Sequence, residues 1–552
     1  MLPLPEQCEP GHYGGENVTS AAAVPAGLSE AQLERALDAF RTVVGKHHVL
    51  TGDEALEFRD PFWYRDWPQY DASAVVQPSS AEEVQAIVRL ANEHGVPLWT
   101  TSQGRNNGYG GSSPRVQGAV VLNLRRMNRV LEINEELGYA VVEPGVRWTD
   151  LYDAITDGGH RLMLTIPDLG WGSVVGNALD HGITYMPYGA DFMAPCGMEV
   201  VLADGELLRT GMGAMPESKA WHLYRRGLGP TLDPLFMQSN FGVVVKMGVW
   251  LMPWPETFAP IWLNAPKETD LIPIIDTTRR LRLDRTLEGV PRLYNTLVFA
   301  SLMEQRTRWY DGDGPTPDHI IDQVAGDLGF GRWVMSMAVW DDNRVADYKI
   351  EKIKSAYEQI PGVQVRFSKH APEEIPALEN HSDRVLGGVP AQEWNNILRW
   401  YGSDAGAHLG NGLIAPLVGA EAFRLHTLIR GVVEREMGLD YFASPMVINA
   451  RSLIHACGAI WDISSEEQTR RSYEGCKMIV REAAKAGFGE YRAHLDYMDL
   501  AADTYSFGDH AYRRLLGRIK DAVDPNGILS PGKQSIWPAS YRGNGQTPES
   551  AR

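Results

Sequence analysis

The amino-acid sequence predicts an α+β protein with more than one domain, and three observations support this prediction. The chain has 552 residues, 44% of them apolar, which is enough to fill several cores. A strand, a helix and a second strand are expected over residues 74–99, the pattern of a βαβ unit. Helical and strand patterns then mix over residues 257–489, and Pro253-Trp254-Pro255 indicates a domain boundary before them.

Helix starts and strand periodicity place the individual elements. Residues 28–43 have helical spacing, with Ser29 as the N-cap and Gln32 at the capping-box position. Ser80 and Glu83 predict the same motif for the helix of the βαβ unit. Further helices are expected over residues 148–156, 345–359 and 417–436, and strands over 119–122, 129–133, 140–143, 198–209, 241–252, 291–299, 331–340 and 411–418.

A glycine-rich loop follows the second strand of this unit. Residues 100–111 combine four glycines with two asparagines, one arginine and several hydroxyl groups. A backbone of this kind can direct several amides toward one anion, so the loop is a candidate for holding a pyrophosphate. Its spacing matches neither the P-loop nor the Gly-x-Gly-x-x-Gly dinucleotide fingerprint. An ordinary surface turn is the alternative for such a loop in isolation.

Charge and composition argue against several classes of partner. The formal net charge is −18, so nucleic acid and anionic membrane surfaces are poor partners. The sequence has no run of about 18 apolar residues that could span a bilayer, and its first residues do not form a secretory signal. The four cysteines lack a Cys-x-x-Cys pair, which favours a reducing, cytoplasmic location. His47-His48 lack the spacing of a metal site, and we expect no metal.

Three separated features could carry chemistry. Tyr109 lies inside the glycine-rich loop, Asp168 lies among glycines, and Tyr491-Arg492 is a phenol and guanidinium pair. Two tyrosine hydroxyls and an arginine can stabilise an oxyanion such as a phenolate, and a carboxylate can act as a base. Each residue taken singly also has a structural explanation, and so has His408, which lies beside glycines.

Five motifs in order give the chain a family resemblance. They are residues 104–111, 167–177, 209–214, 489–492 and 524–533. Together they resemble the vanillyl-alcohol oxidase and para-cresol methylhydroxylase family of flavoproteins, over about residues 28–540. The resemblance implies a two-domain FAD-binding fold with a cap domain over the flavin. The segments it implies are an arm at 1–26, an FAD-binding part at 27–256, a cap at 257–489, and a C-terminal part at 490–552 that completes the FAD-binding domain.

The resemblance also assigns FAD as the cofactor. It implies that the loop holds the pyrophosphate and that a second glycine-rich segment lines the flavin. The implied cofactor-binding residues are Ser102, Gln103, Gly104, Arg105, Asn106, Asn107, Gly108, Gly110, Glu143, Pro167, Gly172, Ser173, Gly176, Asn177 and Lys533. His408 matches the histidine that relatives bond covalently to the flavin, and a histidine there favours the oxidase branch.

Carried over position by position, the resemblance implies a mechanism. Tyr109, Tyr491 and Arg492 would bind a para-substituted phenol as its phenolate. Hydride would leave the para-benzylic carbon for flavin N5 and give a para-quinone methide. Asp168 would direct water onto this species or assist proton loss to an alkene, and Tyr185 would line the pocket. Dioxygen would reoxidise the flavin and yield hydrogen peroxide.

Alternatives remain open at this stage. The same half-reaction could pass electrons to a cytochrome, as in a dehydrogenase. A carbohydrate oxidase on a related FAD domain would not need the Tyr109, Tyr491 and Arg492 device. A binding protein without flavin is a third alternative from a different class. The resemblance further implies a homodimer or a higher homo-oligomer.

Overall fold

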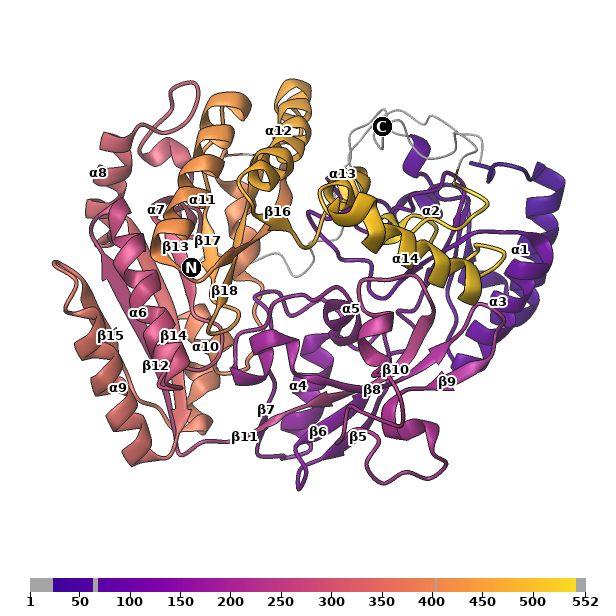
Figure 1. Cartoon of the computed structure of the whole chain (residues 1–552), viewed down its shortest axis with the longest axis horizontal. Coiled ribbons are helices and arrows are strands. Elements are labelled where there is room, and N and C mark those ends of the chain that lie inside the picture. The colour runs from indigo at the N-terminus through magenta and orange to yellow at the C-terminus, as the bar shows by residue number, and fades with distance from the viewer. Residues whose placement is uncertain (1–22, 63–67, 403–404, 543–552) are drawn as a thin grey trace.

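The computed structural model describes residues 23–62, 68–402 and 405–542. Most of the predicted arm at 1–26, together with Cys8, lies outside these residues. Within the described ranges the strands form four sheets. Figure 1 shows two lobes, one built on the largest sheet and its helices and the other on the three remaining sheets.

The first sheet contains the predicted βαβ unit. Its strand order is β1 (Val49–Leu50), β2 (Ala74–Val76), β4 (Val120–Asn123) and β3 (Leu98–Thr101). Strands β2, β4 and β3 run parallel. Helix α3 (Ala81–His94) connects β2 to β3 and packs beside α1 (Glu30–Val44), with the short helix α2 (Asp53–Leu56) following β1.

Both predicted helix starts are confirmed. The hydroxyl groups of Ser29 and Ser80 accept hydrogen bonds from the backbone N–H groups of Gln32 and Glu83, at 3.3 and 3.2 Å. Gln32 completes the first capping box by accepting from the Ser29 N–H at 2.9 Å. The second box differs from the expectation, because the Glu83 carboxylate accepts from the N–H of Ser79 and not from that of Ser80.

The second sheet is antiparallel. Its order is β5 (Val130–Asn134), β6 (Tyr139–Val142), β10 (Val243–Trp250), β8 (Pro195–Val201) and β9 (Leu207–Arg209). Strand β7 (Leu162–Met163) pairs with β11 (Met252–Pro253) as a separate ribbon. Helices α4 (Trp148–Asp157) and α5 (Val174–Leu179) lie between β6 and β8 along the chain.

The largest sheet, called the large sheet, has eight strands in the described part of the chain and is antiparallel. Its order is β15 (Gln364–Phe367), β12 (Thr257–Ala265), β14 (Trp333–Asp341), β13 (Arg292–Asn295), β17 (Ser444–Met446), β18 (Ser452–Asp462), β16 (Gly406–Pro416) and β19 (Gly489–Glu490).

One face of the large sheet is covered by helices (Figure 1). The other face is turned toward the lobe that contains the three remaining sheets, which is called the second lobe. On β13 and β16, Leu293, Leu409 and Leu413 join a core with the helices, and their even-numbered neighbours point to the opposite face. On that face, Ile454 packs with Val142 of the second sheet. The covering helices are α6 (Leu271–Leu283), α9 (Asn343–Tyr357), α11 (Gly419–Val432) and α12 (Glu466–Lys485); α7 (Thr296–Met303), α8 (Asp318–Leu328) and α10 (His381–Leu386) complete this lobe.

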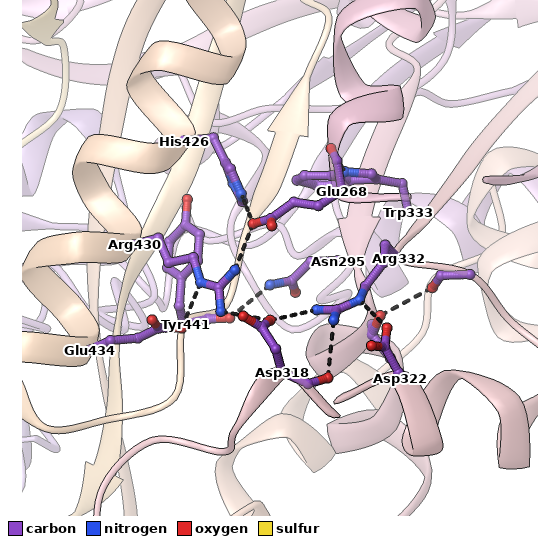
Figure 2. A network of polar contacts seen from close by, with 12 residues as sticks. Glu268, Asn295, Asp318, Asp322, Arg332, Trp333, His426, Arg430, Glu434 and Tyr441 are labelled. Atoms are coloured by element: carbon purple, nitrogen blue, oxygen red, sulfur yellow. Dashed lines mark hydrogen bonds and ion pairs between the residues drawn. The ribbon is translucent and has the colours of Figure 1, made fainter. Parts of the chain in front are cut away.

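A polar network on the helix side ties this lobe together (Figure 2). The guanidinium group of Arg430 in α11 donates to Glu268 at 2.7 Å, to Asp318 at 2.9 Å and to Glu434 at 2.7 Å. His426 contacts the same Glu268 carboxylate at 2.8 Å. Because Glu268 precedes α6 and Asp318 begins α8, this network joins three helices.

The C-terminal segment returns to the other lobe (Figure 1). Helices α13 (Met498–Asp503) and α14 (Phe507–Val523) lead to residues 528–530. There the N–H of Leu98 donates to the carbonyl of Ile528, and the N–H of Ser530 donates to the carbonyl of Leu98, both at 2.8 Å. The end of the chain therefore extends the edge of β3.

One predicted strand is partly wrong. The expectation of a strand over residues 291–299 holds for β13, but α7 begins at Thr296. The Asn295 side chain accepts from the N–H of Val298 at 3.3 Å and caps this helix. The apolar run 297–299 fits a strand or a buried helix equally well, and the cap decides between them.

The four predicted segments of the chain stay a prediction. No helix in the described ranges is long and apolar enough to cross a membrane. In the same residues, no group of three or more His, Cys, Asp or Glu side chains could hold a metal ion.

Candidate functional site

A large cavity lies between the glycine-rich loop, α5 and the C-terminal segment of residues 492–533, which is called the C-terminal return. Its lining includes Ser102, Gln103, Gly104, Arg105, Asn106, Gly110, Gly172, Ser173, Gly176, Asn177 and Lys533, which are predicted cofactor residues, and the predicted catalytic residues Tyr109 and Arg492. Asp180, Gln238, Ser239, Asn240 and Ser530 also line it, and sequence reasoning missed them. Residues far apart in the sequence thus share one wall.

Two glycines bring the segments of this wall into close contact. A Cβ atom on Gly104 would lie 2.0 Å from Oγ of Ser112, and one on Gly176 would lie 2.2 Å from Oγ of Ser102. Any larger residue would force these segments apart. The glycine-rich loop and the start of α5 can therefore approach a ligand with their backbones.

Charged groups of the lining fit an anionic cofactor. Lys533 donates to Asp180 Oδ1 at 3.2 Å, and Nη2 of Arg492 lies 3.6 Å from Oδ2 of the same carboxylate. Burial opposes ionisation of Asp180, but Lys533 and Arg492 outweigh it and lower its pKa. Arg105 lies on the same wall, with its guanidinium 4.8 Å from the Trp171 ring centroid. Lys533 and Arg105 beside a glycine cradle fit the pyrophosphate of FAD.

The structure brings Tyr109, Tyr491 and Arg492 together. The guanidinium carbon of Arg492 lies 4.1 Å from the Tyr109 ring centroid, and Nη2 of Arg492 donates to Oδ1 of Asn106 at 2.6 Å. The Tyr491 hydroxyl donates to the carbonyl of His181 at 3.3 Å. Nε of Arg492 is buried and has no hydrogen-bond partner among the described residues. A cation with a free donor therefore stands beside two phenol groups.

Strand β16 makes room for both tyrosine rings. A Cβ atom on Gly410 would lie 2.8 Å from the Tyr109 hydroxyl oxygen, and one on Gly412 would lie 2.5 Å from Cε1 of Tyr491. Gly410 and Gly412 share one face of the strand with His408 because side chains alternate. Glycines at alternate positions 410 and 412 are a sequence signal that could have predicted a close contact on this face of the strand.

Burial sets the protonation of this group. It raises the pKa of the Tyr109 hydroxyl to about 12, although Arg492 opposes the shift. Burial also raises the pKa of Tyr491. Both hydroxyls are therefore neutral donors at neutral pH, while Arg492 keeps its charge.

His408 contacts the glycine-rich loop without lining the cavity. A Cβ atom on Gly108 would lie 2.4 Å from Nδ1 of His408, and the Gly410 N–H donates to the Gly108 carbonyl at 3.2 Å. Desolvation lowers the pKa of His408 to about 4, so its ring is neutral. A neutral imidazole has a free lone pair that can act as a nucleophile.

Asp168 belongs to a second polar group on the same side of the large sheet. Its carboxylate accepts a short hydrogen bond from the Tyr185 hydroxyl and a bond from Nη1 of Arg292 at 2.8 Å. Arg292 is fully buried, and its guanidinium carbon lies 4.0 Å from the Tyr185 ring centroid. Sequence reasoning missed Arg292, because it lies in a run that is otherwise typical of a plain strand.

Four predicted cofactor residues, apart from His408, are not among the residues that line the cavity. Glu143 is buried, and its carboxylate accepts from the Arg129 backbone at 2.8 Å and from its Nη2 at 2.6 Å. The hairpin of β5 and β6 explains this pair, since it brings Val130 opposite Val142. Asn107, Gly108 and Pro167 are also absent from the lining. The assignment of these four residues to the cofactor stays a prediction.

Two protein families match segments of the chain that contribute to the lining of this cavity. A family described as "FAD binding domain" matches residues 72–211, and one described as "FAD linked oxidases, C-terminal domain" matches residues 455–534. Together with the fit of the cavity to FAD, these matches define the class. The chain is an FAD-dependent oxidoreductase.

Similar proteins narrow the class. The flavoprotein subunit of 4-cresol dehydrogenase (hydroxylating) from Pseudomonas putida is 33% identical over 519 residues, covering 93% of this chain and 98% of that protein. The solved 4-ethylphenol oxidase from Gulosibacter chungangensis, in complex with isoeugenol, is 39% identical with a TM-score of 0.89, covering 94% of this chain and 100% of that one. p-Cresol methylhydroxylase with substrate bound is 32% identical with a TM-score of 0.88, covering 94% and 99%. The chain belongs to the vanillyl-alcohol oxidase and para-cresol methylhydroxylase family, which confirms the predicted fold class.

Proposed function

We propose that this protein oxidises para-substituted phenols at the para-benzylic carbon and reduces O2 to hydrogen peroxide. The substrates would be 4-alkylphenols, 4-allylphenols and 4-hydroxybenzyl alcohols. The observation that carries the proposal is the Arg492 guanidinium, buried beside the Tyr109 ring with its Nε atom free of partners in the described part of the chain. The names of the relatives agree with a phenolic substrate.

The first task of the site is to bind the phenol as its phenolate. Arg492 supplies a permanent charge, and Tyr109 supplies a neutral hydroxyl donor, because burial raises its pKa. The Tyr491 hydroxyl is neutral for the same reason and can donate to the phenolate once it turns away from the His181 carbonyl. A buried cation with neutral donors favours the anionic form of a phenol over the neutral form. The phenolate oxygen then pushes electron density toward the para carbon.

The second task of the site is to direct the reaction of the benzylic carbon after it has lost hydride. FAD, when bound, supplies the hydride acceptor and passes the electrons on to O2. Loss of hydride converts the phenolate to a para-quinone methide, which reacts with water at its benzylic carbon or loses a side-chain proton. Asp168 is the candidate base for both outcomes, and the Tyr185 hydroxyl and Arg292 hold its carboxylate in place.

The register of the large sheet supports separate positions for the two polar groups. One group contains Asp168 and Arg292, and the other contains Tyr491. Arg292 pairs with Met446, Met446 with Ile454, and Ile454 with Ile414, all facing the second lobe. Three strand steps separate the backbones of Arg292 and Ile414 by about 14 Å. Ile414 is two residues from Gly412, which contacts Tyr491. The two polar groups therefore stand on the same face of the sheet, with strands β17 and β18 between them.

We propose that His408 is the covalent attachment point of FAD. Its low pKa, its contact with Gly108 and its place on the face of β16 that carries Gly410 support this role. The alternative acceptor is a cytochrome, as in a dehydrogenase. We prefer O2 because the 4-ethylphenol oxidase is the more similar of the two relatives, at 39% identity against 33%.

A matched pair of compounds tests the proposal. 4-Ethylphenol can form a phenolate, whereas its methyl ether has the same shape around the para carbon but cannot ionise. We expect oxygen uptake with equimolar hydrogen peroxide from the phenol and less than a hundredth of that rate from the ether. Equal rates would contradict phenolate binding. Reduction of cytochrome c by the phenol without oxygen uptake would favour the dehydrogenase.

A further inference from the structure

Two buried polar atoms beside Asp168 lack a well-formed hydrogen bond. Arg292 is 0% exposed and Tyr294 is 2% exposed. Among the described residues, Nη2 of Arg292 makes no hydrogen bond, and the Tyr294 hydroxyl has only its contact with the Ser336 side chain, which opposes the rise of its pKa. The other donors of Arg292 are occupied, since Nε donates to Ser336 at 3.2 Å and Nη1 to Asp168 at 2.8 Å. A buried polar atom without a well-formed hydrogen bond costs about 1–3 kcal/mol, so two of them together indicate a bound ligand or water.

The two polar atoms point to the side of the large sheet where we place the substrate. Arg292 and Tyr294 alternate with Leu293 on β13, and Leu293 packs into the core on the helix side. By the same alternation, His408, Gly410 and Gly412 of β16 share the face of Arg292 and Tyr294. Arg292 therefore faces the second lobe, as does the carboxylate of Asp168 that it binds, and Tyr294 lies on the same face of the sheet beside α7.

The surroundings of the pair select a small neutral ligand. The Tyr294 ring lies 5.3 Å from the Phe299 ring and 5.5 Å from the Trp394 ring, measured between centroids. These walls are apolar, and the charge of Arg292 is already balanced by Asp168. A second carboxylate would be uncompensated there. A water molecule can accept a hydrogen bond from Arg292 Nη2 through one lone pair and donate one to the Tyr294 hydroxyl oxygen, and its other lone pair stays free to react.

We propose that Arg292 Nη2 and the Tyr294 hydroxyl hold the water molecule that adds to the para-quinone methide; this inference rests on the proposed function. The water oxygen gives an electron pair to the benzylic carbon and forms the new C–O bond. The ring regains its electrons as the phenolate that Arg492 binds, and a water proton passes to the Asp168 carboxylate. The pair thereby sets how much alcohol forms relative to alkene.

The test is the product ratio from 4-ethylphenol. Tyr294→Phe removes the hydroxyl and keeps the ring, and within the described part of the protein it loses only the contact with Ser336. We expect the ratio of 1-(4-hydroxyphenyl)ethanol to 4-vinylphenol to fall roughly tenfold. The rate of anaerobic FAD reduction by 4-ethylphenol should change less than twofold, because the pair acts after hydride has left. Tyr441→Phe is the control: it removes the hydroxyl of another buried tyrosine, which bonds to His455 at 2.6 Å in the core on the helix side, and it should leave the ratio unchanged.

Other outcomes would overturn the inference. An unchanged ratio in Tyr294→Phe, with normal FAD reduction, would reject the pair as the holder of water and leave the proposed function standing. A tenfold or greater loss of the reduction rate would show that Tyr294 acts before hydration. If the wild-type FAD is not reduced by 4-ethylphenol at all, the proposed function and this inference both fail.

Discussion

The guanidinium group of Arg492 lies against the ring of Tyr109, 4.1 Å from its centroid, although the two residues are 383 positions apart in the sequence. The same guanidinium donates to Asn106 at 2.6 Å. The glycine-rich loop and the C-terminal return are thus joined through one cation. This contact places a positive charge where the cofactor cavity meets the face of β16.

Removing this charge should separate substrate binding from cofactor binding. In Arg492→Met, kcat/KM for 4-ethylphenol should fall roughly 100-fold, because a hydrogen-bonded charge for the phenolate is lost. The visible FAD spectrum should persist, since Lys533 and Arg105 still line the cavity. Steady-state kinetics with an absorbance spectrum checks both parts. Arg308→Met, at a half-exposed surface pair with Glu304, is the control.

The space above Gly412 can be tested directly. A Cβ atom in Gly412→Ala would lie 2.5 Å from Cε1 of Tyr491, so the ring must move. We expect kcat/KM to fall more than tenfold while the protein still folds and binds FAD. Gly326→Ala in α8 has no atom within 4 Å of the added carbon and should keep full activity. Full activity in Gly412→Ala would show that the position of Tyr491 is unimportant.

Covalent attachment of FAD predicts an acid-stable colour. When wild-type protein is precipitated with acid, the yellow colour should stay in the pellet. In His408→Ala it should pass to the supernatant, because the nucleophilic imidazole is missing. His319→Ala, at an exposed position of α8, should behave as wild type. Colour retained in the His408→Ala pellet would reject this attachment point.

The Glu268 network makes stability depend on pH at the acidic end. The hydrogen bond from His426, followed by the charge of Arg430, lowers the pKa of Glu268 to about 2 from an ordinary value of 4.5, against the effect of burial. Since the folded pKa lies below the unfolded one, the stabilisation is complete above about pH 4.5 and is lost as the pH falls toward 2.

Glu268→Gln tests this dependence by thermal unfolding. The variant should unfold at a lower temperature than wild type at pH 7, and the gap should narrow as the pH is lowered from 4.5 toward 2. Glu304→Gln, in an exposed pair with Arg308, should show little difference at any pH. A gap that is constant across this range would contradict the assignment.

Local sequence signals predicted much of the fold. The Ser29 and Ser80 caps and the strand, helix and strand pattern are short-range features, and the structure confirms them. The error at 296–299 arose because an apolar run of this length does not distinguish a strand from a buried helix. The Glu83 carboxylate accepts from Ser79, one residue before the predicted Ser80, and helix ends commonly differ from the predicted position by one or two residues.

The candidate site required long-range information. The loop residues were found because glycine and hydroxyl groups cluster in sequence, whereas Arg292 meets Asp168 across 124 positions. Glu143 differs from Arg292, since its carboxylate pairs with a short-range partner, Arg129, and its role toward the cofactor stays a prediction. The pairing of β5 with β6 could have revealed that ion pair, but periodicity within one strand could not reveal the Arg292 contact.

The most direct test of the central claim is the absorbance spectrum of a bound phenol that cannot be oxidised. 4-Hydroxyacetophenone absorbs at different wavelengths as phenol and phenolate and has no hydrogen on its para-benzylic carbon. At a pH below its own pKa, the ligand bound to wild type should show the phenolate band, and Arg492→Met should greatly reduce that band. A bound ligand with the spectrum of the neutral phenol would contradict phenolate binding by Tyr109, Tyr491 and Arg492.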